Sequence, residues 1–409
     1  METSVDHIKS ILDRHLQEIP IQLSGPDRAE FLAGKLPSMD QDTRLELRKY
    51  AESFLNQMSL LSASDIDLGG HGCNGKVWYR IHGTKKPWER GPEFAYDQFT
   101  LLILNLLSDR QIAFLIRNKS LDFSYTSILN EDERYRASAY FDLDHLALNM
   151  RKIESEIRPF SGLNLHPNVA RQLSLNHLKY GLTLVTGITG SGKSSTLDTI
   201  VDANNQTVNA HIVIISSPLE LIHKTKKCII RHREVGRDVD SFRDGIVQAM
   251  RQDPDIIVIG ELRDSVAIRN ALEVTDSGHK VFSTLHTASA MESIDRIVGE
   301  TAQEEQDRVR MRLADVLTCV ISQKLVKKTD GTRTLAKEVM ITTPPINAAI
   351  QNDNVSEIYQ MMHEGAQYGM HTLEQDLNRL VELNQISREE AISQANNKSR
   401  MLQLLNKSI

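Results

Sequence analysis

The amino-acid sequence predicts an α/β protein with a doubly wound, phosphate-binding core, an α+β domain before that core and a helical region after it. Three observations support this prediction. An apolar strand leads directly into a complete G-x-x-x-x-G-K-[ST] loop and then into a helix. After Gly181, continuous Val/Ile-rich runs alternate with helical patterns, as in parallel sheets buried on both faces. The 409-residue chain is long enough for two or three domains.

The loop is the strongest indication of chemistry. Its glycines let the backbone point several N–H groups at phosphate oxygens, and the helix that follows adds partial positive charge. We expect Lys193 to reach the β- and γ-phosphates of ATP and the Ser194 hydroxyl to bind Mg²⁺. The expected nucleotide-binding residues are Gly187, Thr189, Gly190, Ser191, Gly192, Lys193, Ser194 and Ser195.

Composition argues against other classes of protein. The formal net charge of −6 provides no overall basic field, so no nucleic-acid partner is expected. The chain begins Met1-Glu2-Thr3-Ser4, without a signal-peptide pattern. Its longest apolar run, from Leu101 to Leu107, is too short to span a bilayer. We therefore expect a cytoplasmic protein.

The N-terminal part is expected to contain two regions. Residues 1–60 are interpreted as a helical extension broken by Pro20, Pro26 and Pro37. Residues 61–155 are interpreted as an α+β domain, followed by a linker over 156–170. The expected elements of the α+β domain are strands at Lys76–His82, Leu121–Tyr125 and Tyr135–Tyr140 and a helix near Phe99–Ile116.

The core is expected over residues 171–345, with a C-terminal helical region over 346–409. The ligand site of such a core lies at the carboxyl ends of its strands. The expected strands are Leu182–Thr186, His211–Ile215, Ile256–Ile259, Lys280–Thr284 and Thr334–Ile341. The expected helices begin at Lys193 and Ser241, and a third covers Ser265–Asp276.

Two strand ends carry candidate catalytic groups. The apolar strand after Asp255 ends at Glu261, and the second strand of a P-loop core brings a carboxylate to Mg²⁺ or to the attacking water. A solvated loop acid is the alternative. His279 and His286 flank a later strand, and His286 is expected on the nucleotide side. A structural histidine is the alternative there, since the spacing does not indicate a metal.

A basic stretch lies between the phosphate loop and the strand that leads to Glu261. We interpret most of it as a solvated charged hairpin, and the alternative is that one or two arginines reach the phosphates of a neighbouring subunit. Its members are Lys224, Lys226, Lys227, Arg231, Arg233 and Arg237.

Together, these motifs resemble the secretion-superfamily ATPases of type II and type IV secretion, and within them the PilT-like pilus-retraction branch. The resemblance covers about residues 60–400. Besides the phosphate loop, it rests on Ala63–Ile66, Asp122–Tyr125, Arg233–Asp238, Asp253–Asp255, Gly260–Asp264, Ser277–Thr287, Val320–Leu325 and Gly369–Gln375.

The resemblance implies a homohexameric ring of RecA-like cores, each with a PAS-like N-terminal domain that packs on the next subunit. Nucleotide would lie between the two domains. Glu261 corresponds to the Walker B glutamate, Glu220 belongs to the Asp box, and His279 and His286 form the His box. Arg136 and Arg151, together with Arg134, stand where the family's arginines approach the γ-phosphate.

The implied function is hydrolysis of ATP with Mg²⁺ to drive a retraction-type pilus or a related type II/IV secretion machine. The implied partners are copies of the chain itself, an inner-membrane platform and a paralogous ATPase. The implied location is the inner face of the cytoplasmic membrane, with peripheral association.

Two departures from the family pattern bear on the hydrolysis rate. The Asp box reads Ser216-Ser217-Pro218-Leu219-Glu220, so a serine replaces its first glutamate. A serine hydroxyl can hold a water but cannot accept its proton at neutral pH. Asp144 stands where relatives carry another arginine. The alternative function is therefore a weakly hydrolysing accessory subunit that modulates an active paralogue, whereas the net charge disfavours a DNA-translocating motor.

Overall fold

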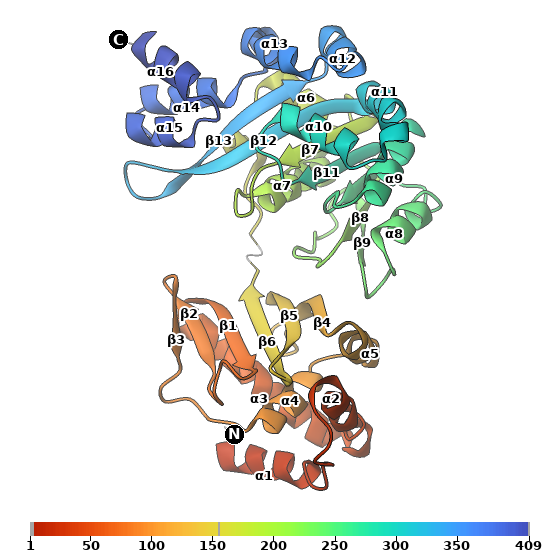
Figure 1. Cartoon of the computed structure of the whole chain (residues 1–409), viewed down its shortest axis with the longest axis vertical. Helices are drawn as coiled ribbons and strands as arrows, with labels where there is room; N and C mark the ends of the chain where they lie inside the picture. The colour runs from red at the N-terminus through yellow and green to blue at the C-terminus, as the bar shows by residue number, and fades with distance from the viewer. Residues whose placement is uncertain (1–3, 154–155, 408–409) are drawn as a thin grey trace. The chain divides into compact units, whose positions relative to one another are not determined.

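The computed structural model describes residues 4–153 and 156–407 of the chain. Its contacts define two units, drawn in Figure 1. The first contains the described residues up to 153 together with segments 217–222 and 236–238. The second contains the remaining residues up to the C-terminal helices.

The first 60 residues form helices, as predicted. These are α1 (Val5–His15), α2 (Gly25–Ala33), the short η1 (Leu36–Ser38) and α3 (Gln41–Leu60). Their apolar residues Ile8, Leu32 and Phe54 belong to the same hydrophobic cluster as Ile66 and Leu148 of the sheet that follows. Residues 1–60 and 61–153 are therefore built around one shared core.

The sheet of the first unit has six strands in the order β3-β2-β1-β6-β5-β4, and every neighbouring pair is antiparallel. The three predicted strands are present as β2, β4 and β5. The strands β1, β3 and β6 were not predicted. Their bounds are β1 Ala63–Gly69, β2 Trp78–Ile81, β3 Thr84–Pro87, β4 Ser120–Thr126, β5 Arg134–Asp142 and β6 His145–Lys152.

The single helix predicted near Phe99–Ile116 is wrong. The structure has two helices, α4 (Tyr96–Leu104) and α5 (Asp109–Asn118). The break occurs because the Ser108 hydroxyl accepts from the backbone N–H of Gln111, whose side chain bonds back to Ser108. This reciprocal capping box starts a new helix at Asp109, although the sequence before and after it is rich in apolar residues.

The second unit is built on a seven-stranded sheet in the order β13-β12-β7-β11-β10-β8-β9. Six strands are parallel, and β13 at one edge is antiparallel to β12. Every residue of β7, β10 and β11 is buried, as is typical of parallel strands covered on both faces, and β10 is apolar throughout. The bounds are β7 Gly181–Thr186, β8 His211–Ser216, β9 Ile229–Glu234, β10 Ile256–Ile259, β11 Lys280–Leu285, β12 Leu317–Lys327 and β13 Arg333–Ile341.

Two strands of this sheet were not predicted. β9 lies inside the basic stretch, where Cys228 and Ile230 are buried and the chain pairs with β8. The hairpin interpretation is therefore wrong for this part of the stretch. β12 pairs with β7 beside the phosphate loop, and the polar run Ser322-Gln323-Lys324 interrupts its apolar pattern.

Helices complete the second unit, and three of them form a small C-terminal core. Leu377, Met401 and Leu405 of this core pack with Val326 of β12 and Ala336 of β13. Two elements, η2 and α6, fall within or overlap the predicted linker. The bounds are η2 Phe160–Leu163, α6 Pro167–Leu173, α7 Lys193–Thr207, α8 Phe242–Ala249, α9 Ser265–Asp276, α10 Ala290–Gly299, η3 Gln303–Glu305, α11 Gln306–Val316, α12 Pro344–Gln351, η4 Val355–Glu357, α13 Ile358–Glu364, η5 Ala366–Tyr368, α14 Leu373–Glu382, α15 Arg388–Gln394 and α16 Lys398–Lys407.

Among the described residues, no helix combines the length and apolar character needed to cross a bilayer.

Candidate nucleotide site

The phosphate loop joins β7 to α7 in the second unit, as predicted. Gly187 is required because a Cβ atom there would lie 2.4 Å from Ser191 Oγ and 2.5 Å from the carbonyl oxygen of Gln323. Gly192 has φ +88°, a left-handed conformation that favours glycine, immediately before α7 begins at Lys193. The loop is therefore held closely against β12.

Lys193 is a buried cation with neutral neighbours. Its side chain donates to the carbonyl oxygens of Gly187 (2.9 Å) and Ile188 (3.2 Å), and Nζ lies 3.4 Å from Nδ1 of His286. Burial lowers the pKa of Lys193. A buried ammonium with carbonyl acceptors gains strongly from an anionic ligand, so this residue fits a phosphate.

His286 connects Lys193 to Glu261 because β11 lies between β7 and β10 in the sheet. Its Nε2 is 3.4 Å from Oε2 of Glu261. Lysine can only donate, so Nδ1 of a neutral imidazole accepts and the proton is assigned to Nε2, toward Glu261. Burial, followed by the charges of Lys193, Arg296 and Arg263, lowers the pKa of His286. The ring is therefore neutral at pH 7.

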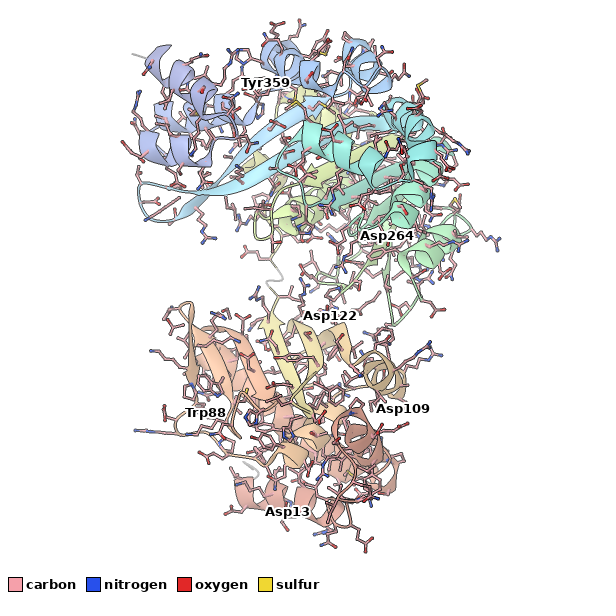
Figure 2. The ribbon with its side chains drawn as sticks, viewed as in Figure 1. Asp13, Trp88, Asp109, Asp122, Asp264 and Tyr359 are labelled. Carbon is pink, nitrogen blue, oxygen red and sulfur yellow. The ribbon has the colours of Figure 1, made fainter. Side chains whose placement is uncertain are left out.

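Glu261 follows Gly260 at the carboxyl end of β10, and its side chain is 16% exposed. Arg263 forms an ion pair with it. Three residues after Glu261 in the chain, Asp264 (Figure 2) caps the start of α9 by accepting from the backbone N–H of Ala267 at 2.8 Å. The acid predicted at this strand end is therefore a partly buried carboxylate. It lies in the short connection between β10 and α9, whose N-terminus Asp264 caps.

Ser216 lies beside the strand end that carries Glu261. β8 and β10 are neighbouring parallel strands, with Ile215 opposite Ile259. A Cβ atom on Gly260 would lie 2.8 Å from Ser216 Oγ. The residue that departs from the family pattern therefore stands next to the strand end that carries Glu261.

The donor set fits Mg²⁺ bound together with a nucleotide. Thr189 and Gly190 of the loop and Ser194 and Ser195 of the first turn of α7 are exposed. Within residues 4–153 and 156–407, no three His, Cys, Asp or Glu side chains are grouped so that they could hold a metal ion. Ser194 and Glu261 alone would need phosphate oxygens to complete a magnesium shell.

The remaining expected catalytic residues belong to the first unit. Arg136 on β5 and Arg151 on β6 are direct cross-strand neighbours. Arg136 forms an ion pair with Glu220 at 3.3 Å, and Arg134 donates to the Glu220 carbonyl oxygen at 2.7 Å. Arg151 donates to the buried Asp65 at 2.8 Å. The structure thus brings these arginines and Glu220 together.

His279 lies at the opposite end of β11 from His286. Its Nδ1 lies 2.9 Å from Ser277 Oγ and 3.1 Å from the carbonyl oxygen of Val274, where α9 turns into the strand. The two histidines of the expected His box therefore do not meet, and only His286 is at the phosphate loop. Asp144 lies in the turn between β5 and β6 and has φ +66°.

Gln323 on β12 was quoted for the family resemblance but was given no role. It is 2% exposed, and its Nε2 donates to the carbonyl oxygen of Ser191 at 2.8 Å. The Gln323 carbonyl oxygen also lies close to Gly187. Gln323 therefore holds the phosphate loop at both Gly187 and Ser191. The motif from Val320 to Leu325 could have indicated it, but only the pairing of β12 with β7 shows what the residue does.

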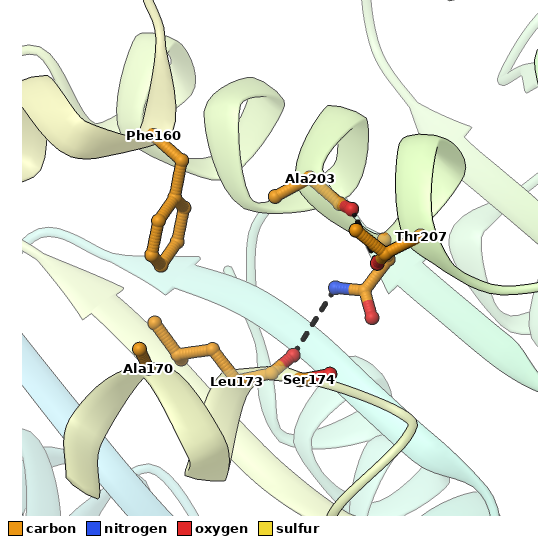
Figure 3. Close-up of a pocket in the computed structure, with 7 residues that line it drawn as sticks. Phe160, Ala170, Leu173, Ser174, Ala203 and Thr207 are labelled. Atoms are coloured by element: carbon orange, nitrogen blue, oxygen red, sulfur yellow. Dashed lines mark hydrogen bonds between the residues drawn. The ribbon is translucent and has the colours of Figure 1, made fainter. Parts of the chain in front are cut away.

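A separate small pocket lies at the other end of α7 (Figure 3). Its volume is about 170 Å³, and Phe160, Leu173 and Thr207 are among the residues that line it. Its contact with α7 begins at Ala203, ten positions after Lys193, or about 15 Å along a helix. This pocket is therefore distinct from the phosphate loop.

Relatives of known identity support the interpretation of the site. The chain is 39% identical over 304 residues to the type IV pilus retractation ATPase PilT of Pseudomonas aeruginosa, covering 74% of this chain and 87% of that protein. It is 30% identical over 317 residues to the type IV pilus ATPase PilU of the same organism, covering 77% and 81%.

A solved structure agrees with these relatives. The crystal structure of the pilus retraction motor PilT with bound ADP matches this chain with a TM-score of 0.77 and 34% identity, covering 86% of this chain and 98% of that one. The α/β fold is thus that of a PilT-like ATPase. A family model for the type II/IV secretion system proteins matches residues 134–408. The chain belongs to the type II/IV secretion system protein family, as its motifs predicted.

Proposed function

We propose that this chain is a retraction-type motor of a type IV pilus or of a related type II/IV secretion machine, and that it binds ATP with Mg²⁺ at the loop of the second unit. The observation that carries the proposal is the convergence of Lys193, His286 and Glu261 at the carboxyl ends of β7, β11 and β10. A buried cation, a neutral imidazole and a carboxylate beside a phosphate loop suit phosphoryl transfer to water.

The chain is an ATPase of its family, and its motor function belongs to pilus or secretion machines. Similarity to pilus ATPases extends over about three quarters of the chain, and the related PilT structure holds ADP. These similarities support nucleotide binding at the loop of the second unit.

Each residue of the site has a distinct task in this proposal. Lys193 leaves the carbonyl oxygens of Gly187 and Ile188 and binds phosphate. His286 keeps its proton on Nε2 and holds Glu261 in place. Glu261 orients the attacking water and accepts its proton. Mg²⁺, held by Ser194 and Glu261, would supply positive charge to the phosphates when bound.

We further propose that the arginines of the first unit act in a ring of subunits. Arg136, Arg151 and Glu220 would contribute to sites in a homohexamer in which the seven-stranded sheet is the RecA-like core and the first unit contains the PAS-like domain. The ring would dock on an inner-membrane platform at the cytoplasmic face of the membrane. Nucleotide between domains, and the division at residues 60, 155, 170 and 345, remain predictions.

Ser216 favours a second candidate function. The Ser216 side chain lies against Gly260, next to the strand end that carries Glu261. The family pattern has a glutamate at this position, so this chain lacks that carboxylate. A subunit lacking it would bind ATP, hydrolyse it slowly and modulate a paralogous ATPase. General acid–base help is typically worth about 10²- to 10⁴-fold, so the loss could separate a motor from an accessory subunit.

The steady-state ATPase rate of the purified protein tests the proposal, with Glu261→Gln and Ser216→Glu beside it. We expect slow hydrolysis by the wild type, nucleotide trapped by Glu261→Gln, and a faster Ser216→Glu. Tight ATP binding with no gain in Ser216→Glu would favour the accessory subunit. A Glu261→Gln variant that hydrolyses at the wild-type rate would refute the assignment of Glu261.

A further inference from the structure

We propose that the turn between α15 and α16, residues 394–397, positions the nucleotide site, with Asn396 as the residue that couples the C-terminal helices to ATP hydrolysis. This inference rests on the proposed function, since it assigns a positioning role in the same reaction. It concerns a region for which the sequence indicated helices but no task.

A buried charged cluster lies beneath this turn. Lys324 on β12 interacts electrostatically with Glu338 on β13 and Glu374 on α14. Glu338 is 2% exposed and Glu374 is 1% exposed. Burial raises the pKa of Glu338 to about 7, and the charge of Glu374 acts in the same direction. Groups this deeply buried need defined partners, so the backbone that satisfies them is held in one position.

The C-terminal turn supplies part of that satisfaction. Lys324 Nζ donates to the carbonyl oxygen of Gln394 and to Oδ1 of Asn396, each at 2.8 Å. The backbone N–H of Asn397 donates to Glu374 at 2.8 Å. These three contacts thus hold residues 394–397 on the cluster.

The loop that follows His286 supplies the rest. Asn396 Nδ2 donates to the carbonyl oxygen of Ala288 at 3.1 Å, two residues after His286. The backbone N–H of Ala290 donates to Glu338 at 2.7 Å. Asn396 therefore accepts from β12 with one amide atom and donates to the His286 loop with the other.

The two elements that Asn396 contacts, β12 and the His286 loop, each also contact the phosphate loop. Lys324 follows Gln323 in β12, and successive strand residues point to opposite faces of the sheet. Lys324 therefore bonds to Asn396 on one face, while Gln323 bonds to Ser191 of the phosphate loop on the other. The Ala288 carbonyl lies two residues from the imidazole that contacts Lys193. A shift of Lys193 and His286 on nucleotide binding is thereby transmitted to residues 394–397, and by reciprocity a force on α15 and α16 changes the site.

The test compares Asn396→Ala with Ser393→Ala in the full-length protein. Ser393 is the matched control because its hydroxyl donates within its own helix, to the carbonyl oxygen of Glu390 at 2.9 Å. Kinetics with ATP give kcat and KM, and hydrogen exchange with and without ADP follows a peptide that contains Asn397. A thermal melt checks the fold of each variant.

We expect Asn396→Ala to lower kcat by roughly 2- to 30-fold, the range found for residues that modulate coupling between sites. Adding ADP should slow exchange at Asn397 in the wild type and in Ser393→Ala, but not in Asn396→Ala. A purely structural role would lower the melting temperature without removing the ADP-dependent exchange.

Two results overturn the inference. One is an unchanged kcat in Asn396→Ala, and the other is an ADP-induced slowing of exchange at Asn397 that persists in this variant. If Asn396→Ala melts well below the wild type, Asn396→Asp replaces it, since the carboxylate still accepts from Lys324 but cannot donate to Ala288. Failure of the proposed function is distinguishable, because a wild type that binds ADP with the expected exchange change but hydrolyses no ATP refutes hydrolysis and retains the coupling.

Discussion

Replacing Arg151 by alanine should destabilise the first unit, in addition to any effect on hydrolysis. The Arg151 side chain is 64% exposed, but its partner Asp65 is 3% exposed and accepts from it at 2.8 Å. Removal leaves a buried carboxylate whose nearest remaining cation is Arg80, at 3.5 Å. The loss is therefore mainly the cost of an undercompensated buried charge.

The magnitude follows from these contacts. A hydrogen bond to a charged group is worth about 1.5–3 kcal/mol, and the retained Arg80 pair and the exposed Arg151 side chain reduce the loss to about 1–3 kcal/mol. At about 2–4 °C per kcal/mol for a unit of this size, the melting temperature should fall by about 2–12 °C. Arg136→Ala is the matched control, because it breaks a pair with Glu220 in which both side chains are at least 36% exposed.

Tryptophan fluorescence makes the assay selective. Both tryptophans of the chain, Trp78 and Trp88 (Figure 2), lie in the first unit. Urea unfolding followed by their emission therefore reports on that unit alone. We expect a lower urea midpoint for Arg151→Ala than for the wild type. For Arg136→Ala we expect a free energy of unfolding within about 0.5 kcal/mol of the wild type. Equal midpoints for the two variants would refute the structural role of the Arg151–Asp65 pair.

Three further outcomes follow from the structure. Lys193→Ala should abolish detectable ATP binding in calorimetry with an unchanged melt, and retained affinity would contradict the phosphate assignment. Glu52 is 0% exposed and accepts from Tyr125, Ser127 and Ile128, so Glu52→Ala should cost about 3–5 kcal/mol in the urea assay; a loss under 1 kcal/mol would contradict this. Because the pKa of His286 is lowered below its ordinary 6.5, the unfolded chain binds more protons just below that pH; stability should therefore fall on acidification from about pH 6.5, and a His286→Asn variant with the same slope in thermal melts would exclude this origin.

Local sequence determined the phosphate site because its parts are contiguous. The strand, the glycines and the helix start that identify the loop all lie within residues 182–196, so a short stretch of sequence was enough to locate it. The continuous apolar runs of β8 and β10 likewise indicated buried parallel strands, and Glu261 and His286 were each expected at the carboxyl end of a strand. The structure places them within 3.4 Å of one another.

Tertiary structure alone decided the partners of polar side chains. β9 and β12 were missed because their sequences are interrupted by charged and amide residues that pair with distant parts of the chain. Gln323 supports Ser191 from 132 positions away, and Asn396 bonds Ala288 from 108 positions away. Hydrogen bonds of this kind depend on which strands become neighbours, and strand order is set by packing of the whole sheet, which no local pattern encodes.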